Sequence, residues 1–283
     1  MIGIDHRLLA GHQFAILNPL RLERQHWADL PVVSLAPPRL SSKAHAMPQL
    51  LDLATLSHER LGALLELADR WDRDSDAPFF SLLVRSESKA ELIAAHLSRQ
   101  LIVRAPDGSD ALLRWFDPRV MPHLHWLLTP AQLHTISGPV NGWTWRDESW
   151  SWVSRDVPEP NDATARLRLD DDQWAAVGRL GVLNRTVRQF LRSSPGMRCD
   201  NNFYRRIDAG LREGYEKHGL VDEVDVRLLA QHGLRYPGIH ARPEILHQLS
   251  RVRRGETSYV AACAGLDMDQ LASQDATHYA RMP

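Results

Sequence analysis

The chain has 283 residues, of which 43% are hydrophobic and 24% charged, a composition typical of a globular protein rather than a disordered one. Its 34 basic and 35 acidic residues give a formal net charge of -1, which argues against a nucleic acid partner held mainly by overall charge. This length allows one or two domains.

The cysteine usage and the N-terminal sequence both predict a cytoplasmic protein. Cys199 and Cys263 lack the spacing of a zinc site or a disulfide framework. The first residues, MIGIDHRLLAGHQF, carry charged side chains that a secretory signal would not contain in its apolar core. No run approaches the roughly 18 apolar residues needed to span a bilayer. We therefore expect a cytoplasmic protein with no membrane partner.

The first half of the chain alternates apolar runs of strand length with amphipathic segments of helix length. Strands are predicted over 14–17, 32–35 and 79–84, helices over 57–72 and 88–100, and a hairpin over 101–103 and 111–116. Ser57 and Ser88 are the predicted N-cap residues of the two helices. This order predicts an α/β (α+β) N-terminal lobe, with a mixed sheet and flanking helices.

The second half has the periodicity of helices alone. The polar segment that follows Val153 contains two prolines and resembles a linker. Helices are predicted over 170–191, 201–219, 222–232 and 243–253, each of the last three ending at or before a glycine. Asp170 and Gln173 fit a capping box. We expect an α/β domain over 1–155, a linker over 156–170 and an all-α lobe over 171–283.

A charged corner stands out in the stretch LLRWFDPRVM. Pro118 favours an extended Asp117 and a helix start directly after it. Asp117 can then cap the next segment, and Arg114 and Arg119 are close enough to share its carboxylate. We interpret these residues as a structural corner braced by ion pairs, since unpaired buried charge is costly. A catalytic aspartate, a phosphate-binding arginine and a partner-binding surface are the alternatives.

Histidine pairs occur at His123 and His125 and again at His240 and His247. Two histidines at i, i+2 share a face only on a strand, and the sequence around His123 favours a helix or turn. No Cys, Asp or Glu follows within twenty residues of His125 to complete a ligand set. Phosphate-loop, dinucleotide and nucleophile-elbow motifs do not occur either. We expect no metal, no cofactor and no catalytic residue.

Several short motifs follow one another between residues 79 and 145. They are His96-Leu97, Pro106-Asp107-Gly108, the corner formed by Arg114, Phe116, Asp117, Pro118 and Arg119, and Gly138-Pro139 before Trp143. In this order and spacing the segment resembles the N-terminal domain of bacterial type VI secretion adaptors, also called effector chaperones. The earlier HQFAILNPL and the later LDDDQWAAV resemble the family's opening strand and its entry to C-terminal helices.

The resemblance implies a role without catalysis. Such adaptors bind the N-terminal segment of a toxic effector and load it onto the C-terminal end of the trimeric spike protein. The corner would then be architectural, and recognition would fall to apolar surfaces. Our candidates for partner contact are the aromatic residues Trp143, Trp150, Trp174, Phe190, Phe203 and Tyr215. The alternative is a hydrolase or transferase with a site between the lobes, using Asp117, Arg119 and either His96 or His125.

Overall fold

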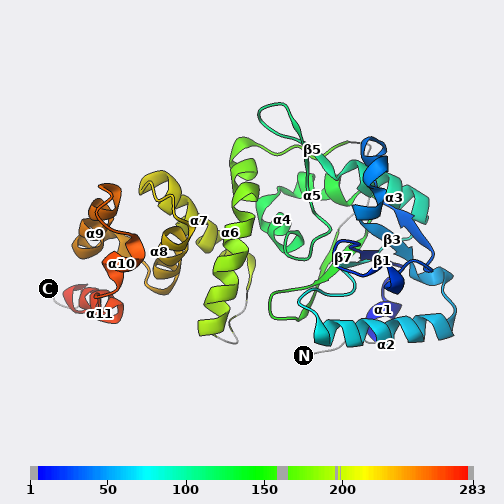
Figure 1. Cartoon of the computed structure of the whole chain (residues 1–283), viewed down its shortest axis with the longest axis horizontal. Helices are drawn as coiled ribbons and strands as arrows, with labels where there is room; N and C mark the ends of the chain where they lie inside the picture. The colour runs from blue at the N-terminus through cyan, green and yellow to red at the C-terminus, as the bar shows by residue number, and fades with distance from the viewer. Residues whose placement is uncertain (1–5, 158–164, 195–196, 198, 280–283) are drawn as a thin grey trace. The chain divides into compact units, whose positions relative to one another are not determined.

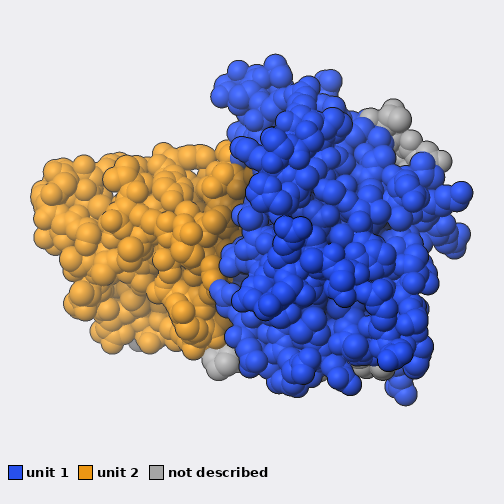
Figure 2. All heavy atoms as spheres, turned by 45° about the vertical axis from the view of Figure 1, so that its right-hand side comes forward, with its two compact units in different colours: residues 1–174 blue, residues 175–283 orange. Residues whose placement is uncertain are grey.

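The computed structural model describes residues 6–157, 165–194, 197 and 199–279. The chain divides into two compact units, residues 1–174 and 175–283 (Figure 2). The division falls in the first turn of helix α6 (Asp171–Ser193). No helix of the described ranges is long and apolar enough to cross a membrane.

Unit 1 is built on a six-stranded sheet in the order β2-β3-β1-β4-β7-β8. Figure 1 labels β1, β3 and β7 of this sheet. The strands are β1 (Phe14–Leu17), β2 (Val32–Ser34), β3 (Gln49–Asp52), β4 (Leu82–Arg85), β7 (Gly142–Arg146) and β8 (Trp152–Asp156). Strands β5 (Ile102–Arg104) and β6 (Asp110–Leu112) pair separately as the predicted hairpin.

The α/β class predicted for this lobe is confirmed, but its sheet is not mixed. Every pairing is antiparallel, including that of β1 with β4, which are separated in the chain by a long helix. A parallel pair needs a crossover connection that returns the chain to the same end of the sheet. Alternation of strands and helices in a sequence does not fix that direction, so the mixed sheet was a wrong inference.

Helices cover both faces of this sheet. They are α1 (His6–Ala10), α2 (His58–Asp74), α3 (Ala90–Arg99), α4 (Met121–Leu127) and α5 (Pro130–Ser137). On one face, α1 and α2 pack against alternate strand residues in a buried cluster that includes Leu9, Ala15, Leu17, Leu51, Leu64, Leu65, Ala68 and Leu83. The opposite face carries Trp143 and Trp145, which contact α5 and α4.

The two predicted serine caps of unit 1 have different outcomes. Ser57 caps α2, because its hydroxyl accepts a hydrogen bond from the backbone N–H of Arg60 at 3.3 Å. Ser88 does not cap α3, which begins at Ala90 with Lys89 in the N-cap position. The backbone N–H of Ser88 instead donates to the hydroxyl of Ser86 at 3.1 Å, so a local turn holds Ser88 one residue before the cap.

Unit 2 is all-helical, as predicted. After α6 it contains α7 (Asn201–Arg212), a π-helical turn (Glu213–Lys217), α8 (Glu223–Arg235), α9 (Pro243–Arg253), α10 (Tyr259–Cys263) and α11 (Met268–Tyr279). The capping box of α6 is present, with Gln173 N–H to Asp170 Oδ1 at 2.8 Å and the reciprocal bond at 3.1 Å.

One helix end in unit 2 was predicted wrongly. Helix α8 continues through Gly233 to Arg235 rather than ending before the glycine. A Cβ at Gly233 would lie 2.7 Å from the imidazole of His240. Glycine at this position therefore allows the His240 ring to approach the backbone of α8 closely. Gly219 and Gly255, with φ of +64° and +72°, do end helical segments as expected.

Candidate functional site

The acidic and basic side chains of the charged corner pair with one another. Arg119 donates from Nε to Asp117 Oδ1 at 2.9 Å and from Nη2 to Oδ2 at 2.8 Å, in a bidentate pair. The backbone N–H of Arg119 also donates to Oδ1 at 3.0 Å, and Arg114 Nη2 lies 3.2 Å from Oδ2. Asp117 is only 4% exposed. Both carboxylate oxygens are therefore occupied by groups of the corner itself.

The prediction that Asp117 caps the following helix is wrong in detail. Helix α4 begins at Met121, with Val120 in the N-cap position and no side-chain cap. The carboxylate of Asp117 instead holds the backbone of Arg119, two residues on, in a turn. The backbone carbonyl of Asp117 accepts from Val120 and Met121 at 2.8 and 3.0 Å, so the residue still fixes where the helix starts.

The electrostatics of the corner keep the carboxylate of Asp117 ionised at neutral pH. Burial opposes the charge on Asp117, but hydrogen bonds from Arg119 and the charges of both arginines outweigh it and lower the pKa of Asp117. The hydrogen bond that Arg119 donates to Asp117 correspondingly raises the pKa of Arg119. A general base needs an accessible oxygen and a pKa near the working pH. This carboxylate has neither, and its geometry favours the structural interpretation.

His96 and His125, the histidines of the enzymatic alternative, are both in packing contacts. His96 is buried; its Nε2 lies 3.2 Å from the carbonyl oxygen of Ile136, and its ring faces Gly138. His125 stacks on Trp145 with ring centroids 5.1 Å apart. Burial and the nearby charge of Arg155 lower the pKa of His125 to about 4, so its ring is neutral at physiological pH.

The tryptophan cluster of residues 143–152 is mostly part of the core. Trp143 is 2% exposed, packs against Trp115 at a centroid distance of 5.8 Å and donates from Nε1 to the hydroxyl of Ser137 at 3.0 Å. Trp145 is buried as well. Trp143 was a candidate for partner contact; its side chain instead fills the space between the sheet and α5. Trp150 is only partly buried.

A buried ion pair that the sequence did not reveal lies at the turn end of the hairpin formed by β7 and β8. Arg146 Nη2 donates to Asp72 Oδ2 at 3.1 Å, and Nη1 donates to the carbonyl oxygen of Trp150 at 2.6 Å. The guanidinium also lies 4.4 Å from the ring centroid of Trp152. Burial raises the pKa of Asp72, although hydrogen bonds from Phe79 and Arg146 act against that rise. Local sequence gives no signal for a pair between α2 and β7.

The aromatic candidates in and near the helical unit fall into two groups. Phe190 and Phe203 are buried and meet edge to face at a centroid distance of 5.7 Å, so they belong to the core of unit 2. Trp174 and Tyr215 are partly exposed. Surface contact with a partner therefore remains open to Trp174, Tyr215 and Trp150, and not to the buried rings.

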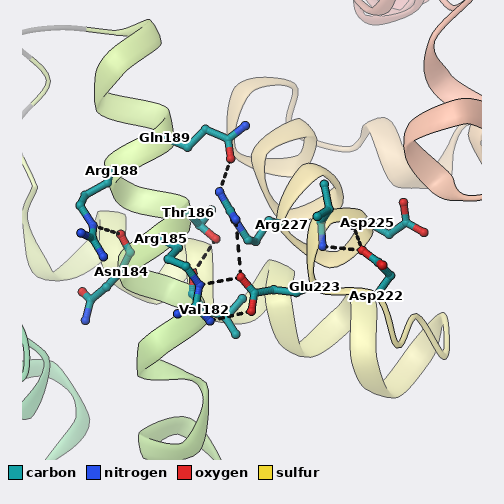
Figure 3. Close-up of polar contacts among 11 residues, drawn as sticks. Val182, Asn184, Arg185, Thr186, Arg188, Gln189, Asp222, Glu223, Asp225 and Arg227 are labelled. Atoms are coloured by element: carbon teal, nitrogen blue, oxygen red, sulfur yellow. Dashed lines mark hydrogen bonds and ion pairs between the residues drawn. The ribbon is translucent and has the colours of Figure 1, made fainter.

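A polar network joins α6 to the start of α8 on unit 2 (Figure 3). Arg185 donates from Nε and Nη2 to the two carboxylate oxygens of Glu223, each at 2.6 Å. Arg227 bridges Glu223 and the side-chain oxygen of Gln189. Arg185 is 46% exposed, so this network contributes modestly to stability.

Glu213 is the most strongly perturbed acid of the helical unit. Burial opposes its charge, but hydrogen bonds from Lys217 and His240 outweigh burial and lower the pKa of Glu213 to about 2. The Nδ1 atom of His240 lies 3.1 Å from Glu213 Oε2, and its Nε2 lies 2.9 Å from the carbonyl oxygen of Leu229. Across the described residues, no three His, Cys, Asp or Glu side chains gather as metal ligands would.

Part of unit 1 matches a known sequence family. Residues 18–135 match the family described as "Domain of unknown function (DUF4123)". The matched segment lies within unit 1, runs from the turn after β1 into α5 and includes the whole Arg114–Arg119 corner. No curated protein and no solved structure matches the chain. The matched segment thus covers the same part of the chain as most of the adaptor-like motifs.

Proposed function

We propose that this chain is a non-enzymatic adaptor of a type VI secretion system. It binds a toxic effector in the cytoplasm of the producing cell and loads it onto the tip of the spike protein. The observation that carries the proposal is the closure of the Asp117 corner, whose carboxylate oxygens are occupied by Arg114 and Arg119. A motif used in this way serves architecture, which is what the resemblance to adaptors implies for it.

Exposed surfaces of the chain then recognise its partners. The partners are the N-terminal segment of the effector and the C-terminal end of the spike, with no nucleic acid and no membrane. Partly exposed aromatic residues are favoured contacts, because a large ring gains contact area at little cost in conformational entropy. Three of the sequence-derived candidates meet that condition, namely Trp150, Trp174 and Tyr215. A stable complex needs roughly 800 Å² of buried surface on each partner, so these rings would be anchors within a larger patch.

A secretion assay tests the proposal. Deletion of this chain from its host should abolish delivery of one effector while the secretion apparatus still assembles and fires. Complementation with the native chain restores delivery, and a chain carrying Trp150→Ala, Trp174→Ala and Tyr215→Ala restores it poorly despite an unchanged Tm. Equal delivery of every effector in the deletion strain would contradict the adaptor role.

A further inference from the structure

A hollow of about 500 Å³ lies at the β2 end of the sheet, within the DUF4123 match. Its apolar wall comes from the turn after β1 and the short helical segments that flank β2, and consists of Pro19, Leu22, Trp27 and Ala44. Leu20, next to Pro19 in the chain, is 61% exposed. A hollow of this size and character can enclose a large apolar side chain.

The side chains that line the hollow include two basic residues, Arg24 and His45. Among the described residues, no Asp or Glu lines it. Within the described residues no carboxylate pairs with Arg24, although arginines elsewhere on unit 1, such as Arg60 and Arg85, do have acidic partners. The neighbouring acid, Glu23, is engaged by Gln25 at 2.6 Å and lies 3.9 Å from His26. Arg24 is therefore available to a carboxylate from outside the chain.

The hollow also borders an open strand edge. The backbone N–H of Leu35 donates to the carbonyl oxygen of Pro48. Hydrogen-bonded and non-hydrogen-bonded residue pairs alternate along an antiparallel pair of strands, so Ser34, the residue before Leu35, belongs to a non-hydrogen-bonded pair. The backbone N–H and C=O of Ser34 therefore point away from β3. No hydrogen bond to either backbone group occurs among the described residues, and Ser34 lines the hollow. An extended polypeptide could pair with Ser34 while a neighbouring side chain enters the hollow.

We propose that this hollow is a binding site for an extended polypeptide segment that carries an apolar side chain next to a carboxylate. The apolar side chain contacts Trp27 and Leu22, the carboxylate pairs with Arg24, and the segment's backbone adds to the free edge at Ser34. The unpaired cation selects an acidic segment over a basic one. This inference concerns the ligand's chemistry and holds whether or not the chain is an adaptor.

The indole N–H of Trp27 provides a direct reporter. Its Nε1 has no hydrogen-bond partner in the described structure, so its resonance should respond to a ligand that enters beside the ring. We would assign that resonance in ¹⁵N-labelled full-length protein from its loss in Trp27→Phe. Three blocked peptides are then titrated, Ac-Val-Leu-Asp-NH₂, Ac-Val-Leu-Lys-NH₂ and Ac-Val-Gly-Asp-NH₂. The first should shift the Trp27 resonance saturably, and the other two should bind at least ten times more weakly.

Matched charge reversals locate the site. Arg24→Glu should weaken the Asp peptide at least tenfold and favour the Lys peptide. Arg21→Glu is the control, because Arg21 is also exposed and without an acidic partner in the described part of the chain, but does not line the hollow. It should bind as the native chain does. Absence of a saturable shift, equal shifts with all three peptides, or equal losses in both variants would overturn the proposal.

Discussion

The imidazole of His96 occupies the space that a side chain at residue 138 would need. A Cβ at Gly138 would lie 2.4 Å from the Cε1 and Nε2 atoms of that ring, and Gly138 has a φ of +53°. Ser86 adds a second contact nearby, since its hydroxyl donates to the carbonyl oxygen of Pro139 at 2.6 Å. The His-Leu and Gly-Pro motifs, distant in the sequence, thus form one buried junction between α3 and the end of α5.

Gly138→Ala should destabilise unit 1 severely. The new Cβ would clash with His96. In addition, the backbone conformation of residue 138 costs about 1–3 kcal/mol for a residue other than glycine. We expect Tm to fall by about 4–8 °C for a loss of about 2 kcal/mol in a domain of this size. Differential scanning calorimetry measures the change.

Gly62→Ala is the matched control for that substitution. Gly62 lies inside α2, and apart from its chain neighbours and the backbone of its own helix no atom lies within 4 Å of its Cβ position. Alanine there should leave Tm unchanged or raise it, because glycine inside a helix costs roughly 0.5–1 kcal/mol relative to alanine. A Gly138→Ala protein as stable as the Gly62→Ala protein would disprove the junction described above.

Asp117→Asn should weaken the corner without removing its shape. The amide keeps one acceptor oxygen but loses the charge that pairs with Arg114 and Arg119, at a cost of about 1–3 kcal/mol. The pKa of Asp117 in the folded chain lies below its unfolded value. Its stabilisation is therefore complete above the unfolded pKa, about 3.9, and is lost as the pH falls through the folded pKa. Urea unfolding at neutral and acid pH should show that the difference in the free energy of unfolding between the native chain and Asp117→Asn becomes smaller as the pH is lowered.

Arg146→Met should cost about 3–5 kcal/mol, since it leaves the carboxylate of Asp72 buried without its cation. The pKa of Asp72, already raised by burial, should rise further. Arg155→Met, an exposed position on the neighbouring strand, is the control and should change stability little. The double variant Asp72→Leu/Arg146→Met should recover part of the loss, and chemical unfolding of all four proteins compares them. Equal losses in the two single variants would contradict a buried pair.

Glu213 should remain ionised in the folded chain until the pH approaches 2. Its pKa lies at about 2 against an ordinary value of 4.5, so its contribution to stability is full above 4.5 and declines as the pH falls through about 2. Carboxyl ¹³C shifts in labelled protein follow this titration. Glu213→Gln should lower the stability of unit 2 at neutral pH, whereas Glu216→Gln, at an exposed carboxylate 3.9 Å from Arg212, should not. An ordinary titration midpoint for Glu213 would contradict the contacts with Lys217 and His240.

Local chemistry was predictable from the sequence because the interacting groups are close along the chain. The Asp107-Gly108 hairpin, the Ser57 cap, the Asp170–Gln173 box and the sharing of Asp117 by its two arginines all involve neighbours within a few residues. Strands β3, β7 and β8 were missed because their apolar residues alternate too briefly to stand out from their surroundings. Their assignment depends on pairing with strands far away in the sequence.

In the candidate site, too, contacts between residues far apart in the sequence could not be predicted from the sequence. Trp143 and Trp150 are alike in sequence, yet one fills the core and the other is partly exposed, because alternate residues of β7 face opposite sides of the sheet while Trp150 lies in the turn at φ +58°. The Asp72–Arg146 pair joins elements 74 residues apart. No spacing rule reaches such contacts, and only the fold could reveal them.

The mass of the particle that this chain forms in its own cells tests the adaptor account most directly. Tagged chain, purified from a strain that expresses its secretion system, is measured by light scattering after gel filtration, and its components are identified by mass spectrometry. The account predicts a stoichiometric complex with one toxin and the spike protein, which Trp150→Ala/Trp174→Ala/Tyr215→Ala weakens. A particle with the mass of the free chain, 32.2 kDa, at every effector level would contradict it.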